Sequence, residues 1–205
     1  MLSVPYIKQP DEESCALACY AMIAKYFFLE TSFEDVAKIS DWEKGYIIWA
    51  FKFWLWIMDR GVRITEYDPL DYMSWASQGI EGLKKSVSEK EFEYYKAHTK
   101  NLESYATDIL KVVHHPNFTM HQEKPIYEEL TNAINNRKPC EVVLNAGALK
   151  NADWFSLHRV VVLDADNDSV IFNDPFYGEQ LVVEKDLFIK SWLDLSEPEL
   201  TIYEL

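Results

Sequence analysis

The chain has 205 residues, of which 48% are hydrophobic and 15% aromatic, so it has ample material for a folded core. A net charge of −14 argues against nucleic acid or an anionic membrane surface as the main partner. This charge would suit a cationic peptide, although high solubility is the simpler interpretation. With six glycines and no glycine-rich phosphate loop, nucleotide binding is not expected, and no cofactor is predicted.

The number of cysteines and the N-terminal sequence indicate the cellular compartment in which the protein is expected to work. Three cysteines are too few, and odd in number, for a disulfide framework, which favours a reducing compartment. The N-terminus has neither the basic segment nor the long apolar segment of a signal peptide. The most apolar run, residues 46–58, includes Lys52 and is too short to cross a bilayer. We therefore expect a cytoplasmic protein that does not enter a membrane.

The first part of the chain is predicted to be largely helical after a short strand at residues 4–7. Apolar residues recur at helical spacing over residues 15–28, and Asp11 or Ser14 is placed to cap this helix. The start of this helix also contains a candidate functional residue, Cys15. The elements expected next are helices at residues 31–39 and 41–58 and a strand at residues 62–67.

Residues 70–124 differ in character from the rest of the chain. The segment is charged, follows a helical pattern and has no strand signals, so it is predicted to be a helical insertion in a single domain of residues 1–205. It also contains four of the five histidines, namely His98, His114, His115 and His121.

The last part of the chain is predicted to form a sheet. An amphipathic helix is expected first, at residues 125–136. It is followed by strands at 141–144, 157–163, 169–173 and 180–183, a helix at 185–192 and a final strand at 200–203. Helices first and an antiparallel sheet afterwards indicate an α+β fold.

Cys15 stands in the first turn of the helix expected at residues 15–28. A thiol in this position feels the positive end of the helix dipole, which favours the thiolate. Gln9 lies six residues upstream, and its amide can donate a hydrogen bond to the oxygen that becomes negative when a thiolate attacks a carbonyl. The sequence thus predicts Cys15 as a nucleophile and Gln9 as an oxyanion donor, provided that a base lies nearby.

A candidate base and a group to orient it are found near the end of the chain. His158 opens the strand expected at residues 157–163, and it is the only histidine that we place on a strand. Asp174 follows the next strand, at a turn with Pro175, and neighbouring antiparallel strands would bring it close to His158. An imidazole activates a thiolate, and a third polar group fixes which ring nitrogen carries the proton. We therefore expect His158 to be the base and Asp174 the orienting group.

Taken singly, these signals have ordinary explanations. A cysteine near a helix start is usually a small buried hydrophobe, and Asp-Pro after a strand is a common turn. Their joint occurrence in this order favours a catalytic role over these ordinary explanations.

Other candidate sites are weaker. Cys19 lies four residues beyond Cys15, which is not a standard zinc spacing, so no metal site is expected. Trp49, Phe53 and Trp56 are interpreted as core packing, or at most as one wall of a substrate groove.

The sequence resembles the papain-like peptidases that remove double-glycine leaders from bacteriocins, together with their stand-alone relatives (family thirty-nine of the cysteine peptidases). In that family a glutamine stands six residues before the cysteine, a later histidine opens an apolar strand, and an aspartate-proline pair follows sixteen residues further on. Gln9, Cys15, His158 and Asp174-Pro175 have these spacings. The similarity is carried by residues 4–27, 125–144 and 158–192.

The resemblance implies a papain-like α+β fold, with N-terminal helices packed on a C-terminal antiparallel sheet and a helical insertion at residues 70–124. It also implies a bacterial cysteine peptidase or amidase acting on a peptide or amide. That family usually has Gly-Pro after the cysteine, where this chain has Ala16-Leu17, and this bears on the geometry of the oxyanion hole. Two other functions stay open: a catalytically silent binding module of the same fold, and an acyltransferase that uses the same thiol.

Overall fold

The computed structural model describes residues 1–27 and 30–205. In this part of the chain seven strands form one sheet in the order β2-β1-β7-β3-β4-β5-β6, and the C-terminal strand β7 lies in its interior. Neighbours are antiparallel except β1 and β2, which are parallel. The strands are β1 (Arg63–Tyr67), β2 (Phe118–His121), β3 (Cys140–Asn145), β4 (Leu157–Ala165), β5 (Ser169–Asp174), β6 (Gly178–Glu184) and β7 (Leu200–Glu204).

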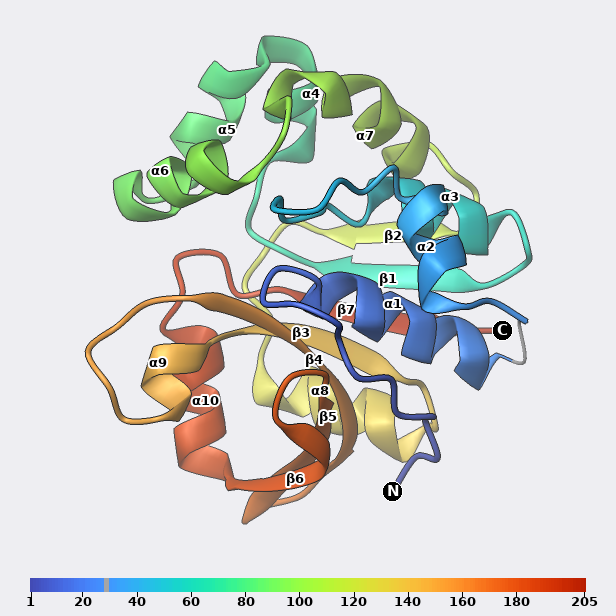
Figure 1. Cartoon of the computed structure of the whole chain (residues 1–205), viewed down its shortest axis with the longest axis vertical. Helices are drawn as coiled ribbons and strands as arrows, with labels where there is room; N and C mark the ends of the chain where they lie inside the picture. Colours follow the sequence, from blue (N-terminus) through green and yellow to red (C-terminus); the bar gives the residue numbers. More distant parts are fainter. Residues whose placement is uncertain (28–29) are drawn as a thin grey trace.

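Helices surround this sheet in two groups (Figure 1). Helices α4 to α7 gather beyond β1 and β2, whereas α8, α9 and α10 lie with β3 to β6. The helices are α1 (Cys15–Tyr26), α2 (Phe33–Ile39), α3 (Phe51–Met58), α4 (Tyr72–Gln78), α5 (Ile80–Ser86), α6 (Glu89–His98), α7 (Ala106–Val113), α8 (Tyr127–Asn135), α9 (Ala146–Leu149) and α10 (Lys185–Leu193), with a 3₁₀ turn η1 (Leu102–Tyr105).

One face of the sheet carries an unusual row of polar side chains. Glu66 of β1 and Glu141 of β3 both pair with Thr201 of β7, and directly opposed residues point to the same face. All three side chains are completely buried. A row of buried carboxyl groups is costly unless it is paired or protonated, so this face is not an ordinary apolar core.

Helices α1 and α3 cover this polar face. Tyr20 of α1 stacks on Phe53 of α3 with ring centroids 4.6 Å apart. Trp54 of α3 donates its indole N–H to the Tyr203 hydroxyl on β7, at 3.1 Å. The opposite face is apolar and packs on α10, where the rings of Phe172 and Phe188 lie 5.8 Å apart. Helix α3 is therefore joined to α1 by an aromatic contact and to the sheet by a polar one.

The predicted α+β fold class is confirmed, since N-terminal helices pack on a largely antiparallel C-terminal sheet. The predicted elements have counterparts in α1, α2, α3, β1, α8, β3, β4, β5, β6, α10 and β7, with ends that differ by a few residues in most cases. Short helix α9 has no predicted counterpart. The expected C-terminal end of the first helix includes Phe28, which lies outside the described residues.

Three expectations about the first helices and their flanks are wrong. The helix expected at residues 41–58 begins only at Phe51, because Asp41 and Gly45 adopt φ values of +56° and +92° that no right-handed helix accepts. Ser14 occupies the N-cap position of α1 but forms no capping hydrogen bond through its side chain. Residues 4–7 do not form a strand, although Leu2 nearby bonds Leu163 through its backbone N–H at 2.7 Å.

The segment at residues 70–124 was expected to be helical throughout, and this expectation is wrong. Its residues Phe118–His121 form β2, which extends the sheet by pairing in parallel with β1. His121 therefore lies on a strand, so His158 is not the only strand histidine. A strand of four residues has too little alternation to stand out in the sequence, and its pairing depends on the exposed edge of β1.

Candidate active site

Cys15 is the first residue of α1 and is half-buried. The Ser14 side chain does not cap the helix, so the free N–H groups of the first turn keep their partial positive charge at this end. The next residues, from Ala16 to Ala24, are all buried. This packing holds the thiol at the edge of the core rather than inside it.

His158 and Asp174 form a hydrogen-bonded pair beside this thiol. They come from the neighbouring antiparallel strands β4 and β5. The His158 Nε2 atom lies 2.8 Å from Asp174 Oδ1, and both side chains are buried. The same Oδ1 accepts the backbone N–H groups of Phe176 and Tyr177 at 2.9 and 3.0 Å, which fixes the carboxylate in the turn after β5. This leaves His158 Nδ1 for the hydrogen bond with Cys15.

The ionisation of Cys15 and His158 is coupled through this contact. Burial alone would raise the pKa of Cys15, but the hydrogen bond and charge of His158 and the backbone amide of Arg159 outweigh it and lower the pKa. Burial would lower the pKa of His158, but its bonds to Asp174 and Cys15 raise it to about 10. Burial opposes ionisation of Asp174, yet His158 keeps its pKa below the usual range. The arrangement favours a thiolate and imidazolium pair.

The other two cysteines, Cys19 and Cys140, are fully buried, and their pKa values are raised rather than lowered. Cys19 is fully buried and donates its S–H to the Arg159 carbonyl oxygen at 3.3 Å, and burial raises its pKa well above the usual value. Burial also raises the pKa of Cys140, which lies on β3. Among the three thiols of the chain, only Cys15 combines partial exposure with a lowered pKa, which is the pattern of a reactive cysteine.

Gln9 is buried beside the turn that holds Asp174. Its backbone N–H donates to the Pro175 carbonyl oxygen at 2.9 Å. Its side-chain Nε2 donates to the Asp11 carbonyl oxygen at 2.5 Å, which uses one of its two amide hydrogens. Among the described residues, no hydrogen bond uses its second hydrogen. The structure thus joins Cys15, His158 and Asp174 directly and places Gln9 at the adjoining turn.

A cleft with about 770 Å³ of empty space, including its open mouth, runs past Cys15 and His158. Both sides of the fold contribute to it, since residues 47–51 and helices α4 and α6 face the start of α1 and β4. Trp49 lines this cleft as one aromatic wall, whereas Phe53 is buried and stacks on Trp56. The other lining residues include Glu13, Ala16, Tyr72, Tyr94, Tyr95, Leu157, Arg159, Glu197 and Glu199.

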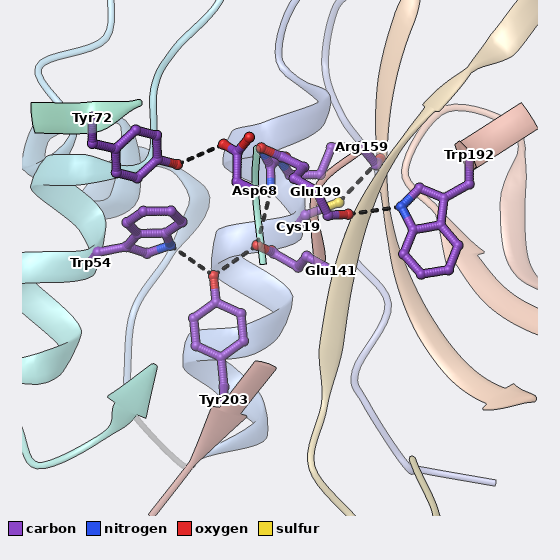
Figure 2. Close-up of polar contacts among 9 residues, drawn as sticks. All are labelled: Cys19, Trp54, Asp68, Tyr72, Glu141, Arg159, Trp192, Glu199 and Tyr203. Atoms are coloured by element: carbon purple, nitrogen blue, oxygen red, sulfur yellow. Dashed lines mark hydrogen bonds and ion pairs between the residues drawn. The ribbon is translucent and has the colours of Figure 1, made fainter. Parts of the chain in front are cut away.

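Arg159 is a lining residue that our sequence reasoning missed. Its guanidinium forms ion pairs with Glu199 and, at 3.6 Å, with Glu141 (Figure 2). Its neighbour His158 contacts Cys15. Figure 2 also shows the Tyr203 hydroxyl bonded to Glu141, at 2.8 Å. A charged residue within the apolar run of β4 was the signal available in the sequence. Buried arginines of this kind need acidic partners, which here come from other strands.

The fold, with a cysteine, a histidine and an aspartate brought together, is that of the papain-like cysteine peptidases. The chain belongs to the Peptidase_C39 like family, whose model matches residues 1–199. It is accordingly a cysteine peptidase-like enzyme, as the sequence predicted. No curated protein sequence matches this chain.

Three solved structures share the fold at low sequence identity. A C39-like peptidase from Bacillus anthracis is 13% identical, with a TM-score of 0.58 over 99% of this chain and 95% of that one. The peptidase domain of Streptococcus ComA, a bifunctional ABC transporter, is 14% identical with a TM-score of 0.52 over 98% of each chain. A double glycine motif protease from an AMS/PCAT transporter, solved with its leader peptide, is 13% identical with a TM-score of 0.51 over 98% and 91%. Among the described residues, no helix is long and apolar enough to cross a membrane.

Proposed function

We propose that this chain hydrolyses a peptide or amide bond through a covalent thioester at Cys15. The observation that carries the proposal is the contact chain from Asp174 through His158 to Cys15, which joins a lowered thiol pKa to a raised imidazole pKa. Such a pair supplies both the nucleophile and the proton that the leaving amine needs. The open cleft beside the sulfur gives a substrate access.

The proposed reaction has two steps. The Cys15 thiolate attacks the carbonyl carbon, the oxyanion collapses, and the amine departs with the proton from His158 Nδ1. A water molecule then gives a proton to His158 and attacks the thioester carbon, which releases the acid and restores the thiolate. Asp174 is the orienting group, because its bond to Nε2 directs Nδ1 toward the sulfur.

Gln9 is proposed as the oxyanion donor together with the backbone N–H of Cys15. The second amide hydrogen of Gln9 supports this role, since Asp11 uses only the first. Gln9→Ala should lower kcat far more than it raises KM, because the donor would act only on the negative oxygen of the transition state. Gln9→Glu is a matched variant of the same size that lacks the donor.

Several broader features belong to the same proposal. Residues 1–205 are taken to form one papain-like domain, with residues 70–124 inserted between β1 and α8. The substrate is a peptide, as in the double glycine motif protease solved with its leader peptide. Three unpaired cysteines support a cytoplasmic setting. The net charge of −14 supports a cationic substrate.

The experiment is alkylation of the intact protein with iodoacetamide at pH 7, read by mass spectrometry at each cysteine, beside a screen for cleavage of a peptide library. We expect selective labelling of Cys15, and cleavage that disappears in Cys15→Ala but survives in Cys140→Ala. Transfer of the acyl group to an added amine would show the acyltransferase alternative. Labelling of Cys15 no faster than that of a free thiol would contradict the proposal.

A further inference from the structure

The cleft beside Cys15 has a strongly acidic part. Glu197 and Glu199 line it, and behind them lie the buried side chains of Glu66, Asp68 and Glu141. We call these five residues the carboxyl cluster. Arg159 is the one cation among the described residues that forms an ion pair with any of them, and it contacts Glu141 and Glu199.

Glu66 is a member of this cluster with few hydrogen-bond partners among the described residues. Glu66 is completely buried, and apart from the neighbouring Thr201 hydroxyl its carboxyl oxygens have no hydrogen-bond partner among the described residues. Its oxygen lies within 4.8 Å of oxygens of Asp68 and Glu199. Figure 2 shows Asp68 and Glu199 beside each other, with Arg159 adjoining. Carboxyl groups so close in a dry interior favour their protonated form, and a cation brought near them would favour the ionised form.

The acidic part of the cleft has aromatic walls. Tyr72 and Tyr95 line the cleft, and the Tyr72 hydroxyl donates to Asp68 Oδ2 at 2.9 Å. Tyr95 lies beside Glu197 and Glu199, whose charges add to burial in raising the pKa of its hydroxyl. Its ring centroid is 4.8 Å from that of Trp49. Aromatic faces next to carboxylates are the chemistry that recognises ammonium and guanidinium groups.

Glu197 is the member of the cluster best placed to meet a ligand. It has no ion pair with a lysine or arginine among the described residues, and Ser196 donates its hydroxyl to only one of its oxygens, at 3.0 Å. Helix α6 holds the adjoining loop in place, because Glu91 accepts the backbone N–H of Ser196 at 3.1 Å. The carboxyl group is therefore fixed in position at the cleft wall.

We propose that the part of the cleft closed by Glu197 and Glu199 is a subsite for a positively charged side chain of the substrate. This inference rests on the proposed function and deepens it, since it names the substrate class as peptides or amides with a lysine-like or arginine-like group near the cleaved bond. The ammonium or guanidinium would lie against Tyr95, and its charge would favour the ionised form of Glu197, whose pKa burial raises to about 9 in the free protein.

The test compares the rates at which matched chloroacetamides alkylate Cys15. Each pair has a linear tail of three to six atoms that ends either in an ammonium group or in a methyl group of similar size. Rates are divided by those with free cysteine to remove intrinsic reactivity. We expect at least one ammonium tail to react about tenfold faster than its methyl partner, and the advantage to fall severalfold at high salt.

Two variants test whether the faster reaction of the ammonium tails depends on the end of the cleft lined by Glu197. Glu197→Gln should remove most of the ammonium advantage, whereas Glu13→Gln, which changes another acid of the cleft near Cys15, should keep it. If Glu197→Gln does not fold, competition in the wild type replaces it. Hexylammonium ion, but not hexanol, should then slow the alkylation of Cys15 by iodoacetamide.

The outcomes separate this inference from the proposed function. Equal rates for ammonium and methyl tails, with Cys15 still labelled selectively, would overturn the subsite and leave the hydrolase proposal standing. No selective labelling of Cys15 by any probe would overturn both. Loss of the ammonium advantage on addition of Ca²⁺ or Mg²⁺, with a rise in the unfolding temperature, would show a metal site in place of a substrate subsite.

Discussion

His158 and Arg159 are adjacent on β4, and they serve the two polar centres of the protein. His158 bonds Asp174 and Cys15, whereas the guanidinium of Arg159 pairs with Glu199 and Glu141. The backbone amide of Arg159 also bonds the Cys15 sulfur, so the reactive thiol and the carboxyl cluster share one strand. A change in the charge of one centre is therefore felt at the other through a short, dry path.

The first prediction concerns the pH dependence of thiol reactivity. The pKa of Cys15 is lowered and that of His158 is raised to about 10, so the ion pair exists between these two values. Alkylation of Cys15 should already be fast at pH 7 and should rise little up to pH 9, unlike that of a free thiol. His158→Ala should slow it at pH 7 by about 10 to 100-fold, because the thiol then keeps its proton.

A histidine elsewhere in the sheet serves as the control for this prediction. His121 on β2 is partly exposed and pairs with Glu123 at 3.8 Å, away from the cleft residues. His121→Ala should leave the alkylation profile unchanged. A wild-type profile that follows the titration of an ordinary thiol near pH 9 would contradict the ion pair.

The second prediction concerns the orienting role of Asp174. Asp174→Asn keeps an oxygen that can accept the backbone N–H groups of Phe176 and Tyr177, so the turn should survive. A neutral amide stabilises the imidazolium less than a carboxylate does, and kcat/KM should fall by about 10² to 10⁴-fold. Asp166→Asn is the matched control, since Asp166 also accepts two backbone N–H groups, from Asp168 and Ser169, in an exposed turn. Equal losses in both variants would indicate a structural effect only.

The third prediction concerns Ala16, where the double-glycine leader peptidases usually have glycine. Ala16 follows the nucleophile and lines the cleft. Removing its methyl group should let a substrate backbone approach more closely, so Ala16→Gly should raise kcat/KM. It should also lower the free energy of unfolding by about 0.5 to 1 kcal/mol, because glycine weakens a helix. Ala16→Val should lower kcat/KM, and a fall in Ala16→Gly as well would show that the alanine already fits its substrate.

The sequence predicted more of the thiol site than of the carboxyl cluster. Cys15, His158 and Asp174 are each tied to a local feature, a helix start or a strand end, and the structure brings them together. Their catalytic roles remain predictions. Glu66 and Glu141, in contrast, meet only because the C-terminal strand β7 inserts between β1 and β3. Strand order of this kind depends on tertiary packing and leaves no local signal.

The fourth prediction concerns stability and pH. Burial is the largest cause that raises the pKa of Asp68 and Glu141 to about 7 and that of Glu197 to about 9, with Glu66 raised well above its usual value. Between pH 4.5 and 9 the folded state therefore holds protons that the unfolded state has lost. Because stability falls with pH wherever the folded state binds more protons, the free energy of unfolding should decrease across this range.

Urea denaturation at pH 5, 7 and 9 measures this effect, with an expected loss of about 1 to 3 kcal/mol from pH 5 to pH 9. Glu66→Gln removes one titrating group without changing its size, so it should flatten the decline and raise stability at pH 9. Glu128→Gln, at an exposed position on α8, should leave both unchanged. Stability that rises from pH 5 to pH 9 would mean that a bound cation, or a closer pairing with Arg159, keeps the carboxyl cluster ionised in the folded protein.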